Sequence, residues 1–240
     1  MNYEIIPIGD MALQILYKEP ASDNLQRQIQ QTTKHIEQMN IPGVVELVPA
    51  FQSITVYYNP IITTYHCLFA QVAEICEKHS TEQSTTSKEI IVIPTCYDGE
   101  DLENVARRNG LSTEEVTSIH SSVDYLVYMI GFLPGFPYLK GLPATLSTPR
   151  LATPRLKVPK GAVGIGGDQT GVYPLESPGG WNLIGRTPVP LFDPERQNPF
   201  LLKAGDYLRF TQISAQEYRA IENLVKENQY KVEVKKIENH

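Results

Sequence analysis

The first third of the chain contains two kinds of hydrophobic pattern. Short apolar runs bounded by turn residues predict strands, and apolar positions that recur about every 3.6 residues predict amphipathic helices. The predicted strands are 3–8, 11–17, 44–48 and 54–58, and the predicted helices are 23–39 and 64–79. This order, strand-strand-helix taken twice, predicts an α+β domain with an antiparallel sheet and two helices on one face.

A polar segment without any hydrophobic pattern follows the second predicted helix. Ser80–Ser87 has the composition of a flexible linker. The next apolar run predicts a strand at 89–93. We therefore place a first domain at residues 1–88 and a second domain at residues 89–240.

The second domain is expected to carry a short helical insert at about 98–120. Gly110 is suited to end the first helix of this insert, because glycine readily adopts the left-handed conformation of a helix terminus. Ser112 and Glu115 have the spacing of a capping box, which predicts a second helix that ends near His120.

The composition changes after residue 130. Residues 131–194 hold 11 Gly and 11 Pro, which nearly excludes helix. Short strands separated by turns fit this part of the chain: 125–130, 162–165, 170–173, 181–187, 190–192 and 206–212. A helix at 214–228 and a strand at 231–237 are predicted to follow. Many short strands with Gly and Pro between them indicate a barrel or a sandwich.

The overall composition argues against several classes of protein. The formal net charge is 21 − 27 = −6, whereas a nucleic-acid-binding protein needs a basic surface. No apolar run approaches the roughly 20 residues of a membrane span, and no basic segment precedes the first apolar residues as in a signal peptide. Three cysteines without a pairing pattern suit reduced thiols, so we expect a cytoplasmic protein. We expect no metal site, because the pairs His66-Cys67 and Cys76/His79 cannot all face one ion.

Two features suit anion chemistry but also have simpler explanations. The amides of Gly164, Gly166 and Gly167 could cradle an anion, or these glycines could serve only as turns in a β-domain. His120 could complement the dipole of its helix, or it could move protons at a site near pH 7. The glycine cluster is not a phosphate loop, because no glycine is followed by Lys and then Ser or Thr.

Two further segments of the second domain are unusual. No acidic residue occurs in the 43 positions between Asp124 and Asp168. The basic residues of that stretch are Lys140, Arg150, Arg155, Lys157 and Lys160. They could form an ordinary solvated face, or they could bind a carboxylate, a phosphate or an acidic protein. The aromatic loop at 131–139 could cover one end of a barrel or offer an apolar surface to a partner.

Long stretches of the second domain resemble a known family. They are GFLPGFPYL at 131–139, TPRLKVPKGAVGIGGDQTGVYPLESPGGWNLIGRTP at 153–188 and LFDP at 191–194. GDMAL near the N-terminus and VARRNGLSTEEVTSIH in the helical insert fit as well. Over essentially its whole length the chain resembles the 5-oxoprolinase B-subunit family, also called allophanate hydrolase subunit 1. Within this family it is similar to the Bacillus-type sporulation kinase A inhibitors.

The resemblance implies a fold, an activity and partners. It implies a cyclophilin-like β-barrel for the second domain and a small α/β first domain. The chain would be a non-autonomous subunit of an enzyme that opens 5-oxo-L-proline to L-glutamate with ATP hydrolysis, together with subunits A and C. Bacillus-type members also inhibit the autophosphorylation of a sporulation sensor histidine kinase, so the alternative is a kinase inhibitor with no catalytic role. Prolyl isomerase activity is a weaker hypothesis, since fold does not carry activity.

The matching motifs supply the candidate site residues. We assign catalytic roles in proton transfer and anion stabilisation to His120, Arg155 and Arg186. The candidates for binding substrate or anion are Lys157, Gly164, Gly166, Gly167, Gln169, Thr170, Tyr173, Ser177 and Trp181. The candidates for partner binding are Phe132, Phe136 and Tyr138. ATP would activate the lactam oxygen as a phosphate ester, and this requires positive groups and amide donors where charge develops.

Overall fold

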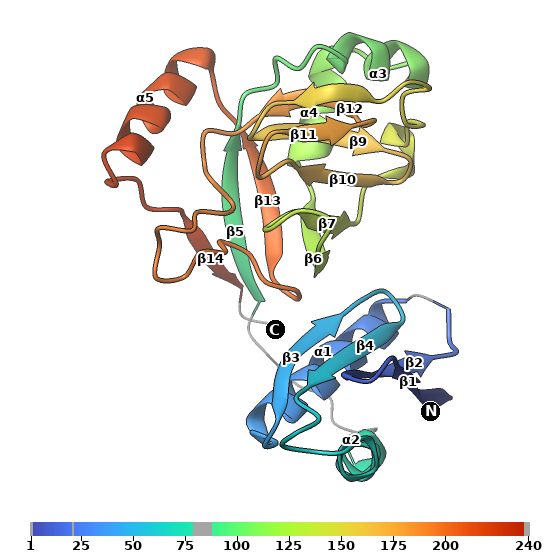
Figure 1. The fold of residues 1–240 in the computed structure, drawn as a ribbon. Coiled ribbons are helices and arrows are strands. Elements are labelled where there is room, and N and C mark those ends of the chain that lie inside the picture. Colours follow the sequence, from blue (N-terminus) through green and yellow to red (C-terminus); the bar gives the residue numbers. More distant parts are fainter. Residues whose placement is uncertain (1, 21, 79–87, 238–240) are drawn as a thin grey trace. The chain divides into compact units, whose positions relative to one another are not determined.

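The structure, a computed structural model, describes residues 2–20, 22–78 and 88–237 (Figure 1). The chain divides into two compact units, Met1–Thr85 and Thr86–His240. The linker predicted at 80–87 lies outside the described residues. Each unit has its own sheet and its own hydrophobic core.

The first unit is an antiparallel sheet with helices. Its elements are β1 (Tyr3–Ile8), β2 (Ala12–Tyr17), α1 (Asp23–Gln38), β3 (Val44–Pro49), β4 (Ser53–Tyr58) and α2 (Tyr65–Lys78). The strands pair antiparallel in the order β1-β2-β4-β3. Leu13, Ile15 and Tyr17 alternate along β2 and are buried in one core with Ile29 of α1 and Val72 of α2. The predicted antiparallel sheet with helices is confirmed.

The second unit is built on a larger mixed sheet. Its first elements are β5 (Lys88–Thr95), α3 (Leu102–Asn109), α4 (Thr113–Ser121), β6 (Asp124–Ile130), β7 (Pro137–Lys140) and the 3-10 turn η1 (Ala144–Leu146). The later elements are β8 (Arg155–Val158), β9 (Ala162–Gly166), β10 (Gln169–Val172), β11 (Ser177–Gly179), β12 (Asn182–Arg186), β13 (Tyr207–Gln212), α5 (Ala215–Lys226) and β14 (Val234–Ile237). The eight-stranded sheet has the order β12-β9-β10-β7-β6-β13-β5-β14, with β5 and β13 parallel. Strands β8 and β11 form a separate pair.

Three kinds of difference separate the predicted elements from the observed ones. Strands β7, β8 and β11, of three or four residues each, are not among the predicted strands. The strand predicted at 190–192 is wrong, since Phe192 makes only an isolated bridge to Phe200. Pro188 and Pro190 lack the amide hydrogen that a strand needs for regular pairing. Helix α3 begins at residue 102, after acidic residues that were expected to lie inside it.

The core of the second unit joins residues from both ends of its sequence. Ile93 of β5, Val163 of β9 and Phe210 of β13 are fully buried in one cluster. Beyond the end of β5, Cys96 and Arg186 exchange two backbone hydrogen bonds of 2.8 Å, which tie this segment to β12. Among the described helices, none is both long enough and apolar enough to cross a membrane.

Candidate functional site

A small cavity of about 120 Å³ lies in the second unit where four segments meet. These segments are the loop between β6 and β7 with the start of β7, the chain after η1, the end of β10, and the turn from β11 to β12. The lining residues are Phe132, Phe136, Tyr138, Arg150, Tyr173, Gly179, Gly180 and Trp181. We call this cavity the aromatic pocket. It gathers two of the predicted substrate-binding residues with all three predicted partner-binding residues.

The indole ring of Trp181 is seated on glycines of β9 and β10. A Cβ atom at Gly166 would lie only 2.4 Å from two atoms of the indole ring, and a Cβ atom at Gly171 would lie 3.1 Å from the ring. Only a residue without a side chain leaves room for the ring at these positions. The glycine cluster that the sequence suggested as an anion cradle therefore has a packing role in this structure.

The amides of that cluster are already engaged. Gly164 and Gly166 lie in β9, whose backbone pairs with β10 on one side and β12 on the other. The amide of Gly167 donates to the carbonyl oxygen of Thr148 at 2.7 Å. Because sheet pairing and this bond use the backbone groups, an anion would have to displace existing hydrogen bonds. A role for these amides in anion binding stays a prediction.

Phe136 is the centre of the aromatic wall. Its ring centroid lies 5.3 Å from Tyr173 and 5.5 Å from Trp181, both in edge contacts, and 5.3 Å from Tyr138. Such tilted and edge arrangements are the preferred geometries of aromatic pairs. Phe136 is only 2% exposed, whereas Phe132 is 65% exposed and has a left-handed backbone with φ of 64°. The loop predicted to bind a partner thus contributes one buried wall residue and one exposed ring.

Arg150 is the charged side chain of the pocket. Its guanidinium carbon lies 5.9 Å from the centroid of the Trp181 ring. Among the described residues, no carboxylate lies within ion-pair distance of Arg150 and no acceptor binds it. Burial raises the pKa of Tyr173, and the charge of Arg150 partly offsets this rise. The pocket therefore presents one cation and has no acidic lining residue.

Arg155 supports the pocket from outside it. Its guanidinium donates to the carbonyl oxygen of Trp181 at 3.2 Å and to both carboxylate oxygens of Asp101 at 2.8 Å. Its Nε atom also lies 2.7 Å from Glu100. Asp101 in turn accepts from the amide of Leu183 at 2.7 Å. Two carboxylates therefore neutralise the predicted catalytic Arg155, which fixes the backbone that carries Trp181.

The other predicted cations are also paired, and they do not line the pocket. Arg186 makes three hydrogen bonds of 2.7–3.1 Å to Asp98, and its guanidinium carbon lies 4.5 Å from the ring centroid of Tyr218. Lys157 is exposed and lies 3.1 Å from Glu176. Sequence reasoning missed the carboxylates at 98–101, which precede α3 and neutralise Arg155 and Arg186. The available signal is the acidic run at 98–101, which could pair with the basic residues that follow at 140–186.

His120 lies inside the second unit and is fully buried. Its Nδ1 is 2.8 Å from the hydroxyl of Tyr97, and its Nε2 is 2.9 Å from the hydroxyl of Thr170. Thr170 donates to the carbonyl oxygen of Gly164, so its oxygen accepts from Nε2–H, and Nδ1 accepts from Tyr97. Burial lowers the pKa of His120 to about 3, which keeps the ring neutral.

The remaining predicted residues also lie outside the pocket lining. Gln169 is half-buried at the start of β10, opposite Gly166. Ser177 is buried in β11, and its hydroxyl donates to the carbonyl oxygen of Pro178 at 3.3 Å. Within residues 2–20, 22–78 and 88–237, no group of three or more His, Cys, Asp or Glu side chains could hold a metal ion.

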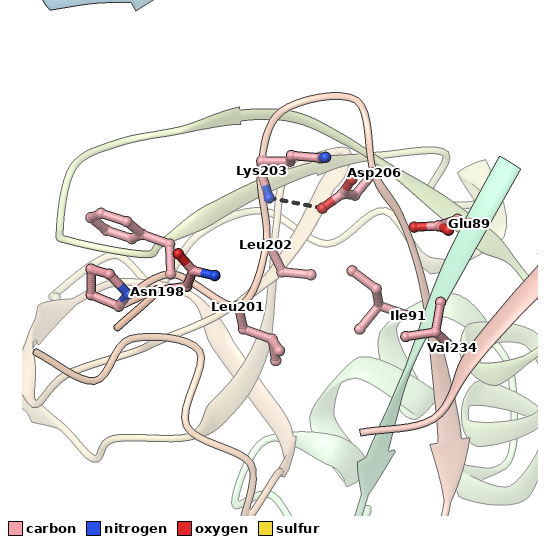
Figure 2. Close-up of a pocket in the computed structure, with 10 residues that line it drawn as sticks. Glu89, Ile91, Asn198, Leu201, Leu202, Lys203, Asp206 and Val234 are labelled. Carbon is pink, nitrogen blue, oxygen red and sulfur yellow. Dashed lines mark hydrogen bonds between the residues drawn. The ribbon is translucent and has the colours of Figure 1, made fainter. Parts of the chain in front are cut away.

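A second and larger cavity lies between the segment before β13 and strands β5 and β14 (Figure 2). We call this cavity of about 400 Å³ the strand-edge groove. Its lining residues are Glu89, Ile91, Asn198, Pro199, Phe200, Leu201, Leu202, Lys203, Asp206 and Val234. The backbone amide of Lys203 donates to Asp206 at 2.9 Å, and burial raises the pKa of Asp206. None of the site residues predicted from the sequence lines this groove.

Comparison with known proteins identifies the class of the fold. A family model described as "Carboxyltransferase domain, subdomain C and D" matches residues 3–202. The crystal structure of the Kluyveromyces lactis urea carboxylase superposes with a TM-score of 0.76 at 18% identity. The match covers 98% of this chain and 24% of that chain, so this chain spans about a quarter of the larger enzyme. The fold is that of a carboxyltransferase-type domain.

Two curated relatives narrow the class further. A protein of Bacillus subtilis (strain 168), named as the B-subunit of 5-oxoprolinase, is 40% identical over 237 residues, which cover 92% of this chain and 97% of the relative. A protein of Escherichia coli O157:H7 with the same name is 44% identical over 208 residues, which cover 85% of this chain and 93% of the relative. The chain therefore belongs to the 5-oxoprolinase B-subunit family.

Proposed function

We propose that this chain is a non-autonomous subunit of an ATP-dependent 5-oxoprolinase, which opens the lactam of 5-oxo-L-proline to give L-glutamate. The observation that carries the proposal is similarity over 97% of the length of a relative named as a subunit of that enzyme. Its partners would be subunits A and C. Because the reaction consumes ATP, the complex would work in the cytoplasm.

ATP fits neither the glycine cluster nor the aromatic pocket, and the larger strand-edge groove is lined by two acidic residues, Glu89 and Asp206, which would repel phosphates. The sequence has no phosphate loop, and the glycine amides that could replace one are engaged in the sheet or with Thr148. The aromatic pocket, at about 120 Å³, is smaller than the roughly 300–1,000 Å³ typical of pockets for drug-sized ligands. We therefore assign ATP to a partner subunit, and no step of our proposal passes through it.

The contribution of this chain is the binding of the small substrate in the aromatic pocket. Trp181, Phe136 and Tyr173 supply apolar walls that exclude water, and exclusion of water strengthens every polar contact made inside. Arg155 holds the Trp181 backbone in place through its bonds to Asp101. The catalytic roles of His120, Arg155 and Arg186 stay predictions, and their buried or paired states favour structural roles.

The same proposal includes a domain boundary at 88/89 and a cyclophilin-like barrel for the second domain. The backbone bonds between Cys96 and Arg186 support closure, because they tie the chain beyond β5 to the opposite end of the sheet, β12. Closure removes unpaired sheet edges, which otherwise invite aggregation. A closed sheet would also hold the strands that carry the walls of the aromatic pocket in fixed positions.

Reconstitution of the enzyme tests the proposed function. The full chain is mixed with purified subunits A and C, 5-oxo-L-proline and ATP, and the release of glutamate is measured. We expect turnover only when all three subunits are present. Undiminished turnover without this chain would overturn the proposal.

Inhibition of a histidine kinase stays a prediction of the family resemblance. The relatives reported above are named for 5-oxoprolinase and urea metabolism. Phe132, exposed and held in a left-handed conformation, is available to a protein partner, but its position at the aromatic pocket suits a small ligand equally well. The enzyme subunit is therefore the function that we put forward.

A further inference from the structure

We propose that Arg150 anchors the carboxylate of a small cyclic acid in the aromatic pocket, with the ring of that acid against Trp181 and Phe136. The identity of the acid as 5-oxo-L-proline rests on the proposed function. The carboxylate anchor rests on the geometry of the pocket alone.

Within the described part of the chain, several arginines of the second unit are paired with carboxylates, whereas Arg150 is not. Three arginines of the second unit each make at least two hydrogen bonds to one carboxylate. They are Arg155, Arg186 and Arg209. Arg150 has no such partner among the described residues, although it lines a cavity. A guanidinium is a rigid fork that matches the two oxygens of a carboxylate. The fork of Arg150 is thus open, and it belongs to the pocket lining.

The walls of the pocket are apolar on the side that faces Arg150. Arg150 is itself exposed, but the pocket beside it is lined by aromatic rings and two glycines, and no acidic side chain lines it. A cation beside such apolar walls attracts an anion more strongly than a cation in open solvent does. Flat rings also favour a flat or cyclic ligand, which can lie against the indole face without steric cost.

The aromatic pocket is small. A cavity of about 120 Å³ holds several waters or a ligand of a few heavy atoms, and it cannot enclose a nucleotide. A five-membered lactam with one carboxylate satisfies all three constraints of charge, shape and volume. A linear dicarboxylate carries a second negative charge that the pocket does not neutralise.

Trp181 makes the test direct, because it is the only tryptophan of the chain and forms part of the pocket wall. The full chain is titrated with 5-oxo-L-proline while tryptophan fluorescence is recorded. Parallel titrations use 2-pyrrolidinone, which lacks the carboxylate, and cyclopentanecarboxylate, which lacks the lactam. We expect saturable changes with both carboxylates, and at least about tenfold weaker binding of 2-pyrrolidinone, as for the loss of a charged hydrogen bond.

Substitution of Arg150 gives the second half of the test. We expect Arg150→Ala to weaken the binding of 5-oxo-L-proline by about tenfold or more and Arg150→Lys to restore part of it. Lys160→Ala is the matched control, because Lys160 is an exposed cation of the same basic stretch that does not line the pocket. The control is expected to bind like the unmodified chain.

The reconstituted complex separates the two proposals. With subunits A and C, Arg150→Ala should raise KM for 5-oxo-L-proline while kcat changes little, since Arg150 holds the carboxylate, which does not react, and not the lactam bond that breaks. If Arg150→Ala and Lys160→Ala have the same KM, the anchor is refuted even though the complex turns over. If turnover does not need this chain, the proposed function fails, and the fluorescence titrations alone decide whether the anchor stands. If the isolated chain binds no ligand, the KM comparison decides.

Discussion

Strands β9 and β10 have two faces that are built from different residues. On one face, branched side chains fill the main core of the second unit: Val163, Ile165 and Val172. On the other face, small residues approach the Trp181 ring and its neighbours: Ala162, Gly164, Gly166 and Gly171. Because side chains alternate along a strand, the sequence GAVGIGG already separates these two sets.

The difference between the faces shows where binding chemistry can occur. On the core face, the hydroxyl of Thr170 and both ring nitrogens of His120 are already engaged with partners inside the fold. On the glycine face, missing side chains create space, a ring from another segment fills part of it, and Arg150 keeps its charge unpaired. Satisfied polar groups stabilise the fold, whereas the open face is the one where we propose that a ligand binds.

The largest expected effect is on the core face. His120→Ala removes a buried ring and leaves the hydroxyls of Tyr97 and Thr170 without this partner, so we expect the second unit to lose about 2–5 kcal/mol of stability. Chemical denaturation measures this loss, and His66→Ala on an exposed residue of α2 is the control. While the variant remains folded, ligand-induced fluorescence of Trp181 should persist. Loss of that response in the folded variant would contradict the view that the core face serves stability and the glycine face serves binding.

The titration of His120 gives the next effect. Burial lowers its pKa from 6.5 to about 3 in the folded protein, so the unfolded chain binds more protons between those values. Stability should therefore fall as the pH falls from about 6.5 to about 3, by up to roughly 1.4 kcal/mol per pH unit from this group. His120→Gln lacks the titration but keeps polar atoms toward Tyr97 and Thr170. The unmodified protein should be more stable than His120→Gln at pH 7, and this difference in unfolding free energy should shrink as the pH falls to 4. A difference that does not change with pH would refute the claim that His120 is buried in its neutral form.

A smaller loss of stability is expected on the glycine face, together with a larger loss of binding. Gly166→Ala places a methyl group against the indole of Trp181, and overpacking of this kind costs about 1–3 kcal/mol. Gly131→Ala is the matched control, because Gly131 does not line the pocket and its Cβ would meet the Met129 side chain at 3.4 Å, an ordinary contact. We expect Gly166→Ala to shift the emission of Trp181 and to abolish the ligand response, and Gly131→Ala to leave the emission unchanged. Equal behaviour of the two variants would mean that the glycines do not seat the ring.

The sequence predicts much of this fold but little of the site. Long periodic segments such as 23–39 and the capping box at Ser112 became helices, because local patterns determine them. The pairing of Arg155 with Asp101 and of Arg186 with Asp98 joins residues 54 and 88 positions apart, and no local pattern reports such contacts. For the same reason the sequence does not show which residues of the basic stretch at 140–160 keep an unpaired charge. In the folded protein, acidic residues neutralise Arg155 and Lys157.

The smallest expected effect is at Arg186, a cation that folding has paired. Its bonds to Asp98 are half-exposed, and exposed ion pairs contribute only about 0–1 kcal/mol. Arg186→Ala should therefore lower stability slightly and change the turnover of the reconstituted complex by less than about twofold, in contrast to Arg150→Ala, which raises KM. Asp98→Ala is the matched variant, since it frees the guanidinium without removing it. If Arg186→Ala instead abolishes turnover while the protein stays folded, an anion displaces Asp98 during the reaction, and pairing in the free chain does not distinguish structural from functional arginines.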